Sequence, residues 1–370
     1  MMLKKVLEEL KLNKKLREEG KYIGLPLPFP RMREKFPYIT KGRYIIMTAS
    51  SKIGKTQITD FLFLYWVFIF QKELKTNLKF KIFYFSLEMS KEDKIKAAIS
   101  FFLNYYKSIV ANPDKISSQY DNYILDDKML SEIEGISPLI EEFLDMVEFV
   151  DEVRNPYGIF KHCQDWAEQN GSYTYKTIKW KNETTGELED RQVINEYIAD
   201  DPDMFPIVIV DHVSLLSPEK GKNLHESMGE FSAVRCLKLR DRFKFLVVAV
   251  QQQAQAQESV ENTKLDMLRP SHTGLGDNKL TGRDCDLMFG LFSPFRHKKT
   301  THEHYDINRL QDNYREFLTI LNRRGTSIAT DLYFDGEVNY FKELPIASQM
   351  TDVLYDKLKT KKFDRVLIKK

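Results

Sequence analysis

An apolar run that passes through a short loop into a helical stretch constrains the fold of this chain more than any other feature. The run YIIMTA leads into the loop ASSKIGKT at residues 49–56, and a helical pattern follows over residues 56–70. In such a strand–loop–helix unit, backbone N–H groups of the loop surround an anion, and the helix N-terminus favours the same negative charge. The sequence therefore predicts a phosphate-binding loop on a β–α unit.

The remainder of the chain repeats this order of strand and helix. Short apolar runs that alternate with helical stretches predict parallel strands joined by crossover helices, and runs without polar residues indicate strands buried on both faces. A last pair of runs that turns at Asp335 and Gly336 predicts a C-terminal β-hairpin. The expected strands contain YIIMTA, KIFYFSLE, FPIVIVDHV, FKFLVVAVQ, DLMFGLF and EFLTILNRR, the hairpin is DLYFDGEVNYF, and further helices are expected over 90–107 and 224–242.

The chain divides into four expected segments. The first alternates leucines and charged residues at helical spacing, which predicts an amphipathic helix, and a Pro-rich stretch behind it predicts a linker. Two polar stretches fit the alternation of strands and helices poorly and are interpreted as insertions, the second of them as a hairpin that turns at NETTGE. The segments are the helix at 1–20, the linker at 21–42, the α/β domain at 43–345 with insertions at 108–145 and 170–204, and a basic tail at 346–370.

Composition sets wider limits on the class of protein. The 370 residues are 42% hydrophobic, enough for one large core or two modest ones. A formal net charge of +2 neither requires nor excludes nucleic acid, so any such contact must come from local basic patches. Three separated cysteines form no disulfide or zinc pattern, which favours a reducing compartment. The apolar run at 61–70 is too short to cross a membrane and is interpreted as a buried helix.

Four side chains at predicted strand ends match the needs of nucleoside triphosphate hydrolysis. Lys55 would reach the β- and γ-phosphates, and Thr56 would bind Mg²⁺. Asp211 ends an apolar strand, where P-loop enzymes place a second Mg²⁺ ligand; the alternative is a turn or cap residue. Glu88 closes the strand that follows the P-loop unit, so it is the best candidate to activate the attacking water. The alternative for Glu88 is an exposed acid at a strand end.

Several segments, taken in order, resemble the helicase domain of the DnaB family of replicative helicases. Residues 49–56 are similar to the Walker A loop of that family, which also begins with alanine, and FSLEMS at 85–90 is nearly identical to the segment that carries its catalytic glutamate. The resemblance extends over about residues 21–343. The further matching segments are IVDHVSLL at 209–216 (Walker B), VVAVQQ at 247–252, GRDCDLM at 282–288 and NRRG at 322–325.

The resemblance implies a RecA-like P-loop NTPase, an α/β fold with a mostly parallel, twisted central sheet flanked by helices. ATP and Mg²⁺ are the implied cofactors. The implied catalytic residues are Glu88, Lys55, Gln252 as the sensor of the γ-phosphate, and Arg323 as an arginine finger. The implied metal ligands are Thr56 and Asp211. The implied nucleotide-binding residues are Ala49, Ser50, Ser51, Lys52, Ile53, Gly54, Lys55, Thr56, Gln57 and Arg324.

The arginine finger has two candidates in this sequence. By the resemblance, Arg323 would reach into the ATP of a neighbouring subunit. The family has a lysine two residues earlier, where this chain has Leu321. Either Arg323 acts with help from Arg324, or the register is shifted by one residue and Arg324 is the finger. A solvated strand end is the structural alternative for both.

The resemblance also implies partners. The DNA-binding loops of the family correspond to residues 258–280, in which Lys264, Arg269 and Lys279 suit contacts to a phosphate backbone. An ordinary flexible surface loop explains the same letters. The amphipathic helix at 1–20 matches the position of a linker helix that docks onto the adjacent subunit; packing on its own core is the alternative.

Together these features lead us to expect a ring-forming homo-hexamer that hydrolyses ATP, moves on single-stranded DNA and unwinds a forked duplex during replication. Primase is a possible further partner, and no membrane contact is expected. Only some forty residues precede the ATPase core, as in stripped motors of some phages and plasmids, and the expected location is the cytoplasm of a bacterium or of a phage-infected host. The alternatives are a RecA-like mediator, loader or regulator that does not unwind, and a binding module with a relic pocket.

Overall fold

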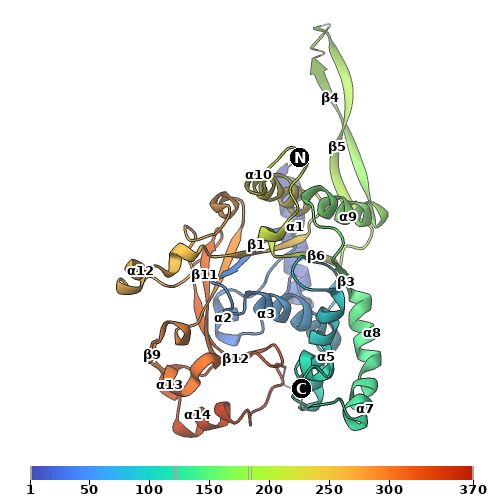
Figure 1. Cartoon of the computed structure of the whole chain (residues 1–370). Coiled ribbons are helices and arrows are strands. Elements are labelled where there is room, and N and C mark those ends of the chain that lie inside the picture. The colour runs from blue at the N-terminus through green and yellow to red at the C-terminus, as the bar shows by residue number, and fades with distance from the viewer. Residues whose placement is uncertain (1, 121–122, 182, 185, 369–370) are drawn as a thin grey trace.

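The computed structural model describes the chain except residues 1, 121–122, 182, 185 and 369–370. A nine-stranded sheet runs through the centre of this described part, with helices on both faces (Figure 1). Its strand order is β13-β12-β11-β8-β1-β7-β6-β2-β3. The strands are β1 (Arg43–Ala49), β2 (Lys79–Ser86), β3 (Val147–Val150), β6 (Met204–Asp211), β7 (Leu246–Gln252), β8 (Leu287–Phe292), β11 (Tyr314–Asn322), β12 (Ala329–Asp335) and β13 (Tyr340–Glu343).

Six neighbouring strands of the sheet, from β8 to β3, are parallel, and β11, β12 and β13 extend it antiparallel. This mostly parallel sheet confirms the predicted α/β class, and the β12–β13 pair is the predicted C-terminal hairpin. The strand β3 and the helix α9 (Pro156–Gln169) were not predicted from the sequence. The four residues of β3 are too few to show a period, and β3 lies at the edge of the sheet beside β2.

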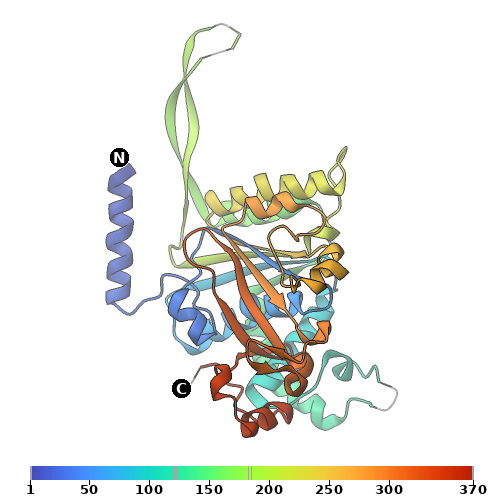
Figure 2. The same cartoon turned by 90° about the vertical axis from the view of Figure 1, so that its left-hand side faces the viewer.

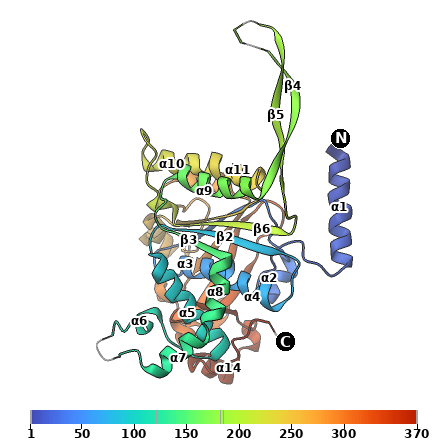
Figure 3. The same ribbon diagram turned by 90° about the vertical axis from the view of Figure 1, so that its right-hand side faces the viewer.

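Two helical layers cover the sheet (Figure 3). One layer contains the helix after the P-loop, and the other contains α9 and the helix predicted over 224–242; both predicted helices are present. Each includes a π-helical segment in its middle. The first layer contains α3 (Lys55–Asp60), η1 (Phe61–Tyr65), α4 (Trp66–Glu73), α5 (Lys91–Lys107) and α8 (Ser137–Met146); the second contains α9, α10 (Leu224–Glu230), η3 (Phe231–Cys236) and α11 (Leu237–Asp241).

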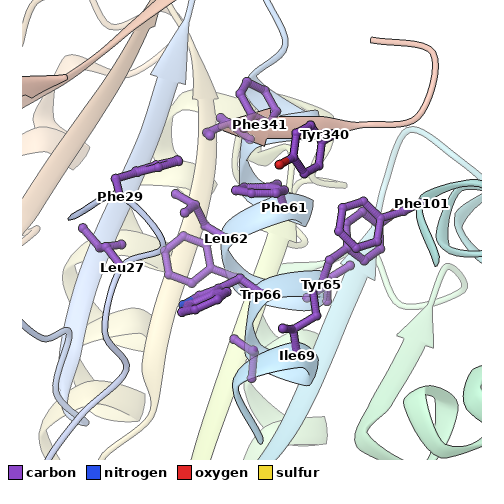
Figure 4. Packing of buried hydrophobic residues seen from close by; sticks show 14 of the residues in the cluster. Leu27, Phe29, Phe61, Leu62, Tyr65, Trp66, Ile69, Phe101, Tyr340 and Phe341 are labelled. Carbon is purple, nitrogen blue, oxygen red and sulfur yellow. The ribbon is translucent and has the colours of Figure 1, made fainter. Parts of the chain in front are cut away.

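The apolar helix at 61–70 forms the centre of the larger core (Figure 4). Every residue from 61 to 70 is buried, which confirms that this run is a core helix. The ring of Phe61 lies 6.1 Å from that of Phe29 and 5.4 Å from that of Phe341, and the ring of Tyr65 stacks on that of Phe101 at 4.3 Å. Aromatic pairs at these separations add to the free energy gained by burying apolar surface.

The Pro-rich stretch at 21–42, expected to be a linker, packs against this core instead. Residues 25 and 39 form a β-bridge, and α2 (Pro30–Lys35) lies between them. The indole of Trp66 donates a hydrogen bond of 2.5 Å to the carbonyl of Pro26. Prolines break the regular pattern of the sequence, but they do not prevent the apolar residues between them from being buried. The buried residues of the stretch are Leu25, Leu27, Phe29, Met32 and Ile39.

By contrast, the N-terminal helix α1 (Met2–Glu18) stands away from the rest of the chain (Figure 2). Only its last turn is tied down, because Arg17 contacts the ring and hydroxyl of Tyr38. The chain becomes anchored again at Tyr22, whose backbone N–H donates to Asn77 at 2.8 Å. The predicted amphipathic helix is therefore present, but its apolar residues face solvent. These residues, between 46% and 70% exposed, are Leu3, Val6, Leu7, Leu10 and Leu12.

The expected insertions and tail differ in how they pack. A long antiparallel ribbon of β4 (Gly171–Lys181) and β5 (Leu188–Ala199) projects beyond the α9–α11 layer, in agreement with the predicted hairpin (Figure 1). Residues 182 and 185 of its NETTGE turn lie outside the described residues. In the C-terminal tail, Arg365 is buried and pairs with Asp335 at 2.9 Å. The remaining helices of these segments are α6 (Pro113–Ile116), α7 (Asp127–Gly135) and α14 (Asp352–Lys359).

Short elements complete the described chain between β7 and β11. They are α12 (Val260–Lys264), β9 (Thr301–His302), β10 (Tyr305–Asp306) and α13 (Ile307–Leu310). Among the described residues, no helix combines the length and the apolar character that crossing a membrane requires.

Candidate nucleotide-binding site

The loop between β1 and α3 has the form that a phosphate-binding loop requires. The strand β1 ends at Ala49, and α3 begins at Lys55. Gly54 caps the helix with φ at +108°, a conformation that residues with a side chain rarely adopt. The first N–H groups of α3 have no partner within the helix, so they and the helix dipole can bind an anion in front of the loop.

A cavity of about 440 Å³ opens in front of this loop. Most of the residues predicted to bind nucleotide line it, together with the predicted catalytic residues Glu88 and Gln252. Ser50 and Ile53 are buried in the loop, and Ala49 is buried at the end of β1, so these three contribute backbone rather than exposed side chains. The lining residues predicted from the P-loop are Ser51, Lys52, Gly54, Lys55, Thr56 and Gln57.

The two predicted metal ligands lie together at the floor of the cavity. The Thr56 hydroxyl is 3.2 Å from Asp211 Oδ1, although the two residues are 155 positions apart in the sequence. Both are oxygen donors, the ligand type that Mg²⁺ prefers. The residues present therefore fit a Mg²⁺ ion held by Thr56 and Asp211.

A buried polar cluster holds the other oxygen of this aspartate. Tyr84 from β2 lies with its hydroxyl 2.8 Å from Asp211 Oδ2, and the Lys94 ammonium lies 3.4 Å from the same oxygen. Lys94 also pairs with Asp60 at 3.0 Å. Burial raises the pKa of Asp60, and Lys94 partly opposes that rise. Burial alone would lower the pKa of Lys94, but the two carboxylates outweigh it and the pKa is raised.

Glu88 faces the cavity from β2, which is not the neighbour of β1 in the sheet. The strand that follows the P-loop unit in the sequence is separated from β1 by β7 and β6. The Glu88 side chain is about half exposed, at 52%, and its carboxylate is 3.9 Å from His212 Nε2. Burial lowers the pKa of His212, and the charge of Lys55 lowers it further. A neutral His212 leaves Glu88 as the ionised base that faces the cavity.

The structure separates the roles of three consecutive glutamines at the end of β7. Gln251 is buried and donates to the carbonyls of Gly276 and Asn278 at 2.7 and 2.9 Å. Gln253 is also buried and donates to Thr48 at 3.0 Å. Gln252 alone of the three lines the cavity. The strand between β1 and β6 thus presents to the cavity the glutamine that the resemblance implied.

Two further arginines hold the P-loop and were missed by the sequence analysis. Arg315 is 1% exposed, lines the cavity and donates from Nε to the carbonyl of Ile53 at 2.8 Å. Arg296 donates to the carbonyls of Ser51 and Lys52 at 3.1 and 2.6 Å. The signal for Arg315 was a charged residue inside an otherwise strand-like run, YREFLTIL. Arg296 lies in an irregular segment that carries no such signal.

Arg323 and Arg324 lie away from the cavity of their own chain. Asn322 at the end of β11 pairs with Leu287, and Leu287 pairs with Ile45, near the start of β1. The P-loop follows the other end of β1. Arg323 is exposed, and its guanidinium donates to the carbonyl of Arg283. The structure therefore does not bring either arginine to the predicted nucleotide site within one chain.

The three residues predicted to bind DNA have different environments. Lys264, at the end of α12, and Lys279 are exposed. Arg269 is bound by two carboxylates: Nε lies 2.7 Å from Glu316, which is buried, and Nη2 contacts Glu303. His302 lies 3.0 Å from Glu316 as well. The charge of Arg269 is thus compensated within the chain, whereas the two lysines point into solvent.

Solved structures provide an independent comparison for the fold. No protein-family model matches the sequence, and no curated protein matches it. The structure is similar to a solved ATPase domain, with a TM-score of 0.64 and 17% identity over 93% of this chain and 98% of that one. It is also similar to a DnaB-like replicative helicase, described with its interactions with primase, with a TM-score of 0.61 and 16% identity over 91% of this chain and 67% of that one.

These similarities establish the fold. The chain has the RecA-like α/β fold of an ATPase domain, as the sequence predicted. More narrowly, that fold is the one found in the ATPase domain of a DnaB-like helicase.

Proposed function

We propose that this protein is an ATP hydrolase that works as a ring-forming motor on single-stranded DNA and unwinds duplex at a replication fork. The observation that carries the proposal is the convergence of Lys55, Thr56, Glu88 and Gln252 on one cavity, above Asp211. These residues come from four different strands or their following loops. A relic pocket would have no reason to retain all of them.

Each residue of the cavity has a place in hydrolysis. The P-loop backbone and Lys55 bind the phosphates and offset charge that develops on the γ-phosphate in the transition state. Glu88 accepts a proton from the attacking water, and Gln252 contacts the γ-phosphate from the neighbouring strand. Thr56 and Asp211 would hold Mg²⁺, which neutralises phosphate charge when it is bound.

One chain lacks an arginine finger in its own cavity, which supports a ring. Arg323 is exposed at the opposite end of the sheet, so it reaches a nucleotide only if a second copy is placed against that end. Helix α1 supports the same assembly, because its apolar residues face solvent in the single chain. We propose that α1 docks on the adjacent subunit of a homo-hexamer.

Contact with DNA is assigned to the loop that follows β7. Lys264 and Lys279 are exposed there and suit the backbone of a single strand, which needs no base recognition. Arg269 is removed from this role by its ion pairs with Glu316 and Glu303. Primase is proposed as a further partner by analogy with the DnaB-like helicase, whose structure was described with it.

A single set of experiments tests the proposal. The purified chain is sized in the presence of ATP and Mg²⁺, its ATPase is measured with and without single-stranded DNA, and strand release from a forked duplex is followed. We expect a ring, stimulation of ATPase by DNA, and ATP-dependent strand release. ATPase with DNA binding but no strand release would instead favour a mediator or loader. Absence of ATP turnover would contradict the enzyme assignment.

A further inference from the structure

Behind the cavity, four elements bring together a closed set of buried polar side chains. Asp60 lies on α3 one turn after Thr56, Tyr84 lies on β2, Lys94 on α5 and Asp211 at the end of β6. All four are at most 3% exposed. Their separation in the sequence hides the cluster, and the motifs of the nucleotide site include only one of its members.

The distances define how the cluster shares its charges. Lys94 Nζ lies 3.0 Å from Asp60 Oδ2, 3.4 Å from Asp211 Oδ2 and 2.6 Å from the Tyr84 hydroxyl. That hydroxyl lies 2.8 Å from both carboxylates. A phenol has one proton, so Tyr84 donates to one carboxylate at a time while it accepts from Lys94. Two carboxylates therefore share one ammonium and one phenolic proton.

Asp211 is consequently held from two sides. Its Oδ2 is occupied by Lys94 and Tyr84, and its Oδ1 is directed at the Thr56 hydroxyl, 3.2 Å away. The ammonium of Lys94 is a cation next to the carboxylate that would bind Mg²⁺, so it competes with that ion for negative charge. Asp60 draws the ammonium away from Asp211, because the Lys94–Asp60 distance is the shorter one.

We propose that Asp60 and Lys94 are positioning residues that set how strongly Asp211 attracts the metal of the nucleotide site. Lys94 orients the Asp211 carboxylate, and Asp60 offsets the charge of Lys94 so that the carboxylate stays available to the cation. This inference rests on the proposed nucleotide-binding function. It adds two residues that contact neither nucleotide nor metal, and it assigns them a measurable effect on metal affinity.

The charges predict a specific pattern among variants. With both carboxylates and the ammonium ionised, the cluster carries one net negative charge. Asp60→Asn leaves Lys94 with Asp211 as its only carboxylate, so the Mg²⁺ concentration at half-saturation should rise by at least about fivefold. The double variant Asp60→Asn with Lys94→Met again carries one net negative charge, that of Asp211, and its half-saturation should return to within about twofold of wild type.

Lys94→Met alone leaves two buried carboxylates without a cation, and it should unfold at a lower temperature than wild type. The double variant therefore carries the test, because it removes the ion pair as a unit. A matched control is Glu141→Gln, which removes one negative charge from the exposed face of α8 and should leave the Mg²⁺ requirement unchanged.

The readout is the Mg²⁺ dependence of binding of a fluorescent ADP analogue, with Mn²⁺ binding in the presence of ADP followed by electron paramagnetic resonance. Thermal unfolding of each variant reports the fold separately. An unchanged Mg²⁺ requirement in folded Asp60→Asn, or no recovery in the double variant, would overturn the positioning role while leaving the nucleotide site intact. Wild-type protein that binds no nucleotide in Mg²⁺ would overturn both the site and this inference.

Discussion

Strand β11 carries an arginine at each end, and the two arginines differ in every physical respect. Arg315, near the start of the strand, is buried and holds the carbonyl of Ile53 in the P-loop of its own chain. Arg323, just beyond the end of the strand, is exposed and contacts only the carbonyl of Arg283 among the hydrogen bonds found for its side chain in the described residues. One arginine is used within the chain, and the other is available to a second copy.

This difference shows how one strand serves two nucleotide sites in the proposed ring. The antiparallel direction of β11 relative to β8 puts its first residues at the P-loop edge and its last residues at the opposite edge. A cation at the first edge completes the chain's own loop. A cation at the second edge is useful only where another subunit's nucleotide is brought to it.

The largest effect is expected at the P-loop edge itself. Lys55→Ala should reduce ATP turnover to background while the fold is kept, because it removes the cation that faces the β- and γ-phosphates. Steady-state ATPase and thermal unfolding measure the two properties separately. Near wild-type turnover in the folded variant would show that this edge is not the nucleotide site.

Next in size is the effect of the exposed arginine. Arg323→Ala should lower turnover about 10³- to 10⁵-fold without a comparable loss of ATP binding, as for arginine fingers in other phosphoryl-transfer enzymes. Mixing Arg323→Ala with Lys55→Ala subunits should restore part of the ATPase, because some interfaces then pair an intact Lys55 with an intact Arg323. Arg324→Ala is the matched control.

Failure to recover activity at any mixing ratio, with subunit exchange confirmed, would break the comparison between the two ends of β11. In that case Arg323 would serve its own subunit or the fold. If Arg324→Ala complements while Arg323→Ala remains active on its own, the finger is Arg324.

A smaller loss is expected when the candidate base is replaced by its amide. Glu88→Gln should slow hydrolysis about 10²- to 10⁴-fold and leave ATP affinity nearly unchanged, because the phosphate-binding loop is intact. Single-turnover hydrolysis and binding of a fluorescent ATP analogue separate the two effects. Equal loss of binding would assign Glu88 a structural role.

The buried arginine of β11 should act on stability and affinity instead of on a neighbour. Arg315→Met leaves the Ile53 carbonyl and the Ser293 hydroxyl without this donor, which should cost about 2–4 kcal/mol of unfolding free energy and weaken nucleotide binding. Mixing with Lys55→Ala subunits should restore nothing beyond the sum of the parts. Complementation would show that Arg315 also acts across an interface.

The smallest effects are expected in the loop after β7, where one cation is compensated and another is not. Arg269→Ala removes a partner of buried Glu316 and should cost about 1–3 kcal/mol. Lys264→Ala should change stability by no more than about 0.5 kcal/mol and yet weaken binding of single-stranded DNA. The order would be reversed if Arg269 were the DNA contact; chemical denaturation and DNA titrations at fixed salt measure both quantities.

The sequence was most informative where local chemistry leaves a repeated signature. The strand–loop–helix unit, the apolar strand that ends in Asp211 and the hairpin at Asp335 and Gly336 could all be predicted, because turns, helix starts and buried parallel strands each require particular residues. Gln252 required the resemblance, since Gln251 and Gln253 are the same residue type. Only the structure shows that these two are buried.

Features that depend on tertiary packing were out of reach of the sequence. The Pro-rich stretch resembles a linker because prolines interrupt its pattern, and its burial depends on Phe61 and Trp66, which come later in the chain. Lys94 and Asp60 are ordinary charged residues in helical stretches, and only folding places them 3.0 Å apart. Likewise, the pairing of Arg269 with Glu316 depends on two segments that are distant in the sequence.

The anchoring of the Pro-rich stretch limits where α1 can go. The helix ends at Glu18, and Tyr22 is already tied to Asn77, so three residues form the tether between them. A tether of three residues spans about 10 Å at most, and the 17-residue helix is about 26 Å long. A receiving surface must therefore lie within one helix length of the anchor. So short a reach gives α1 a high effective concentration at the adjoining surface and none at a distant one.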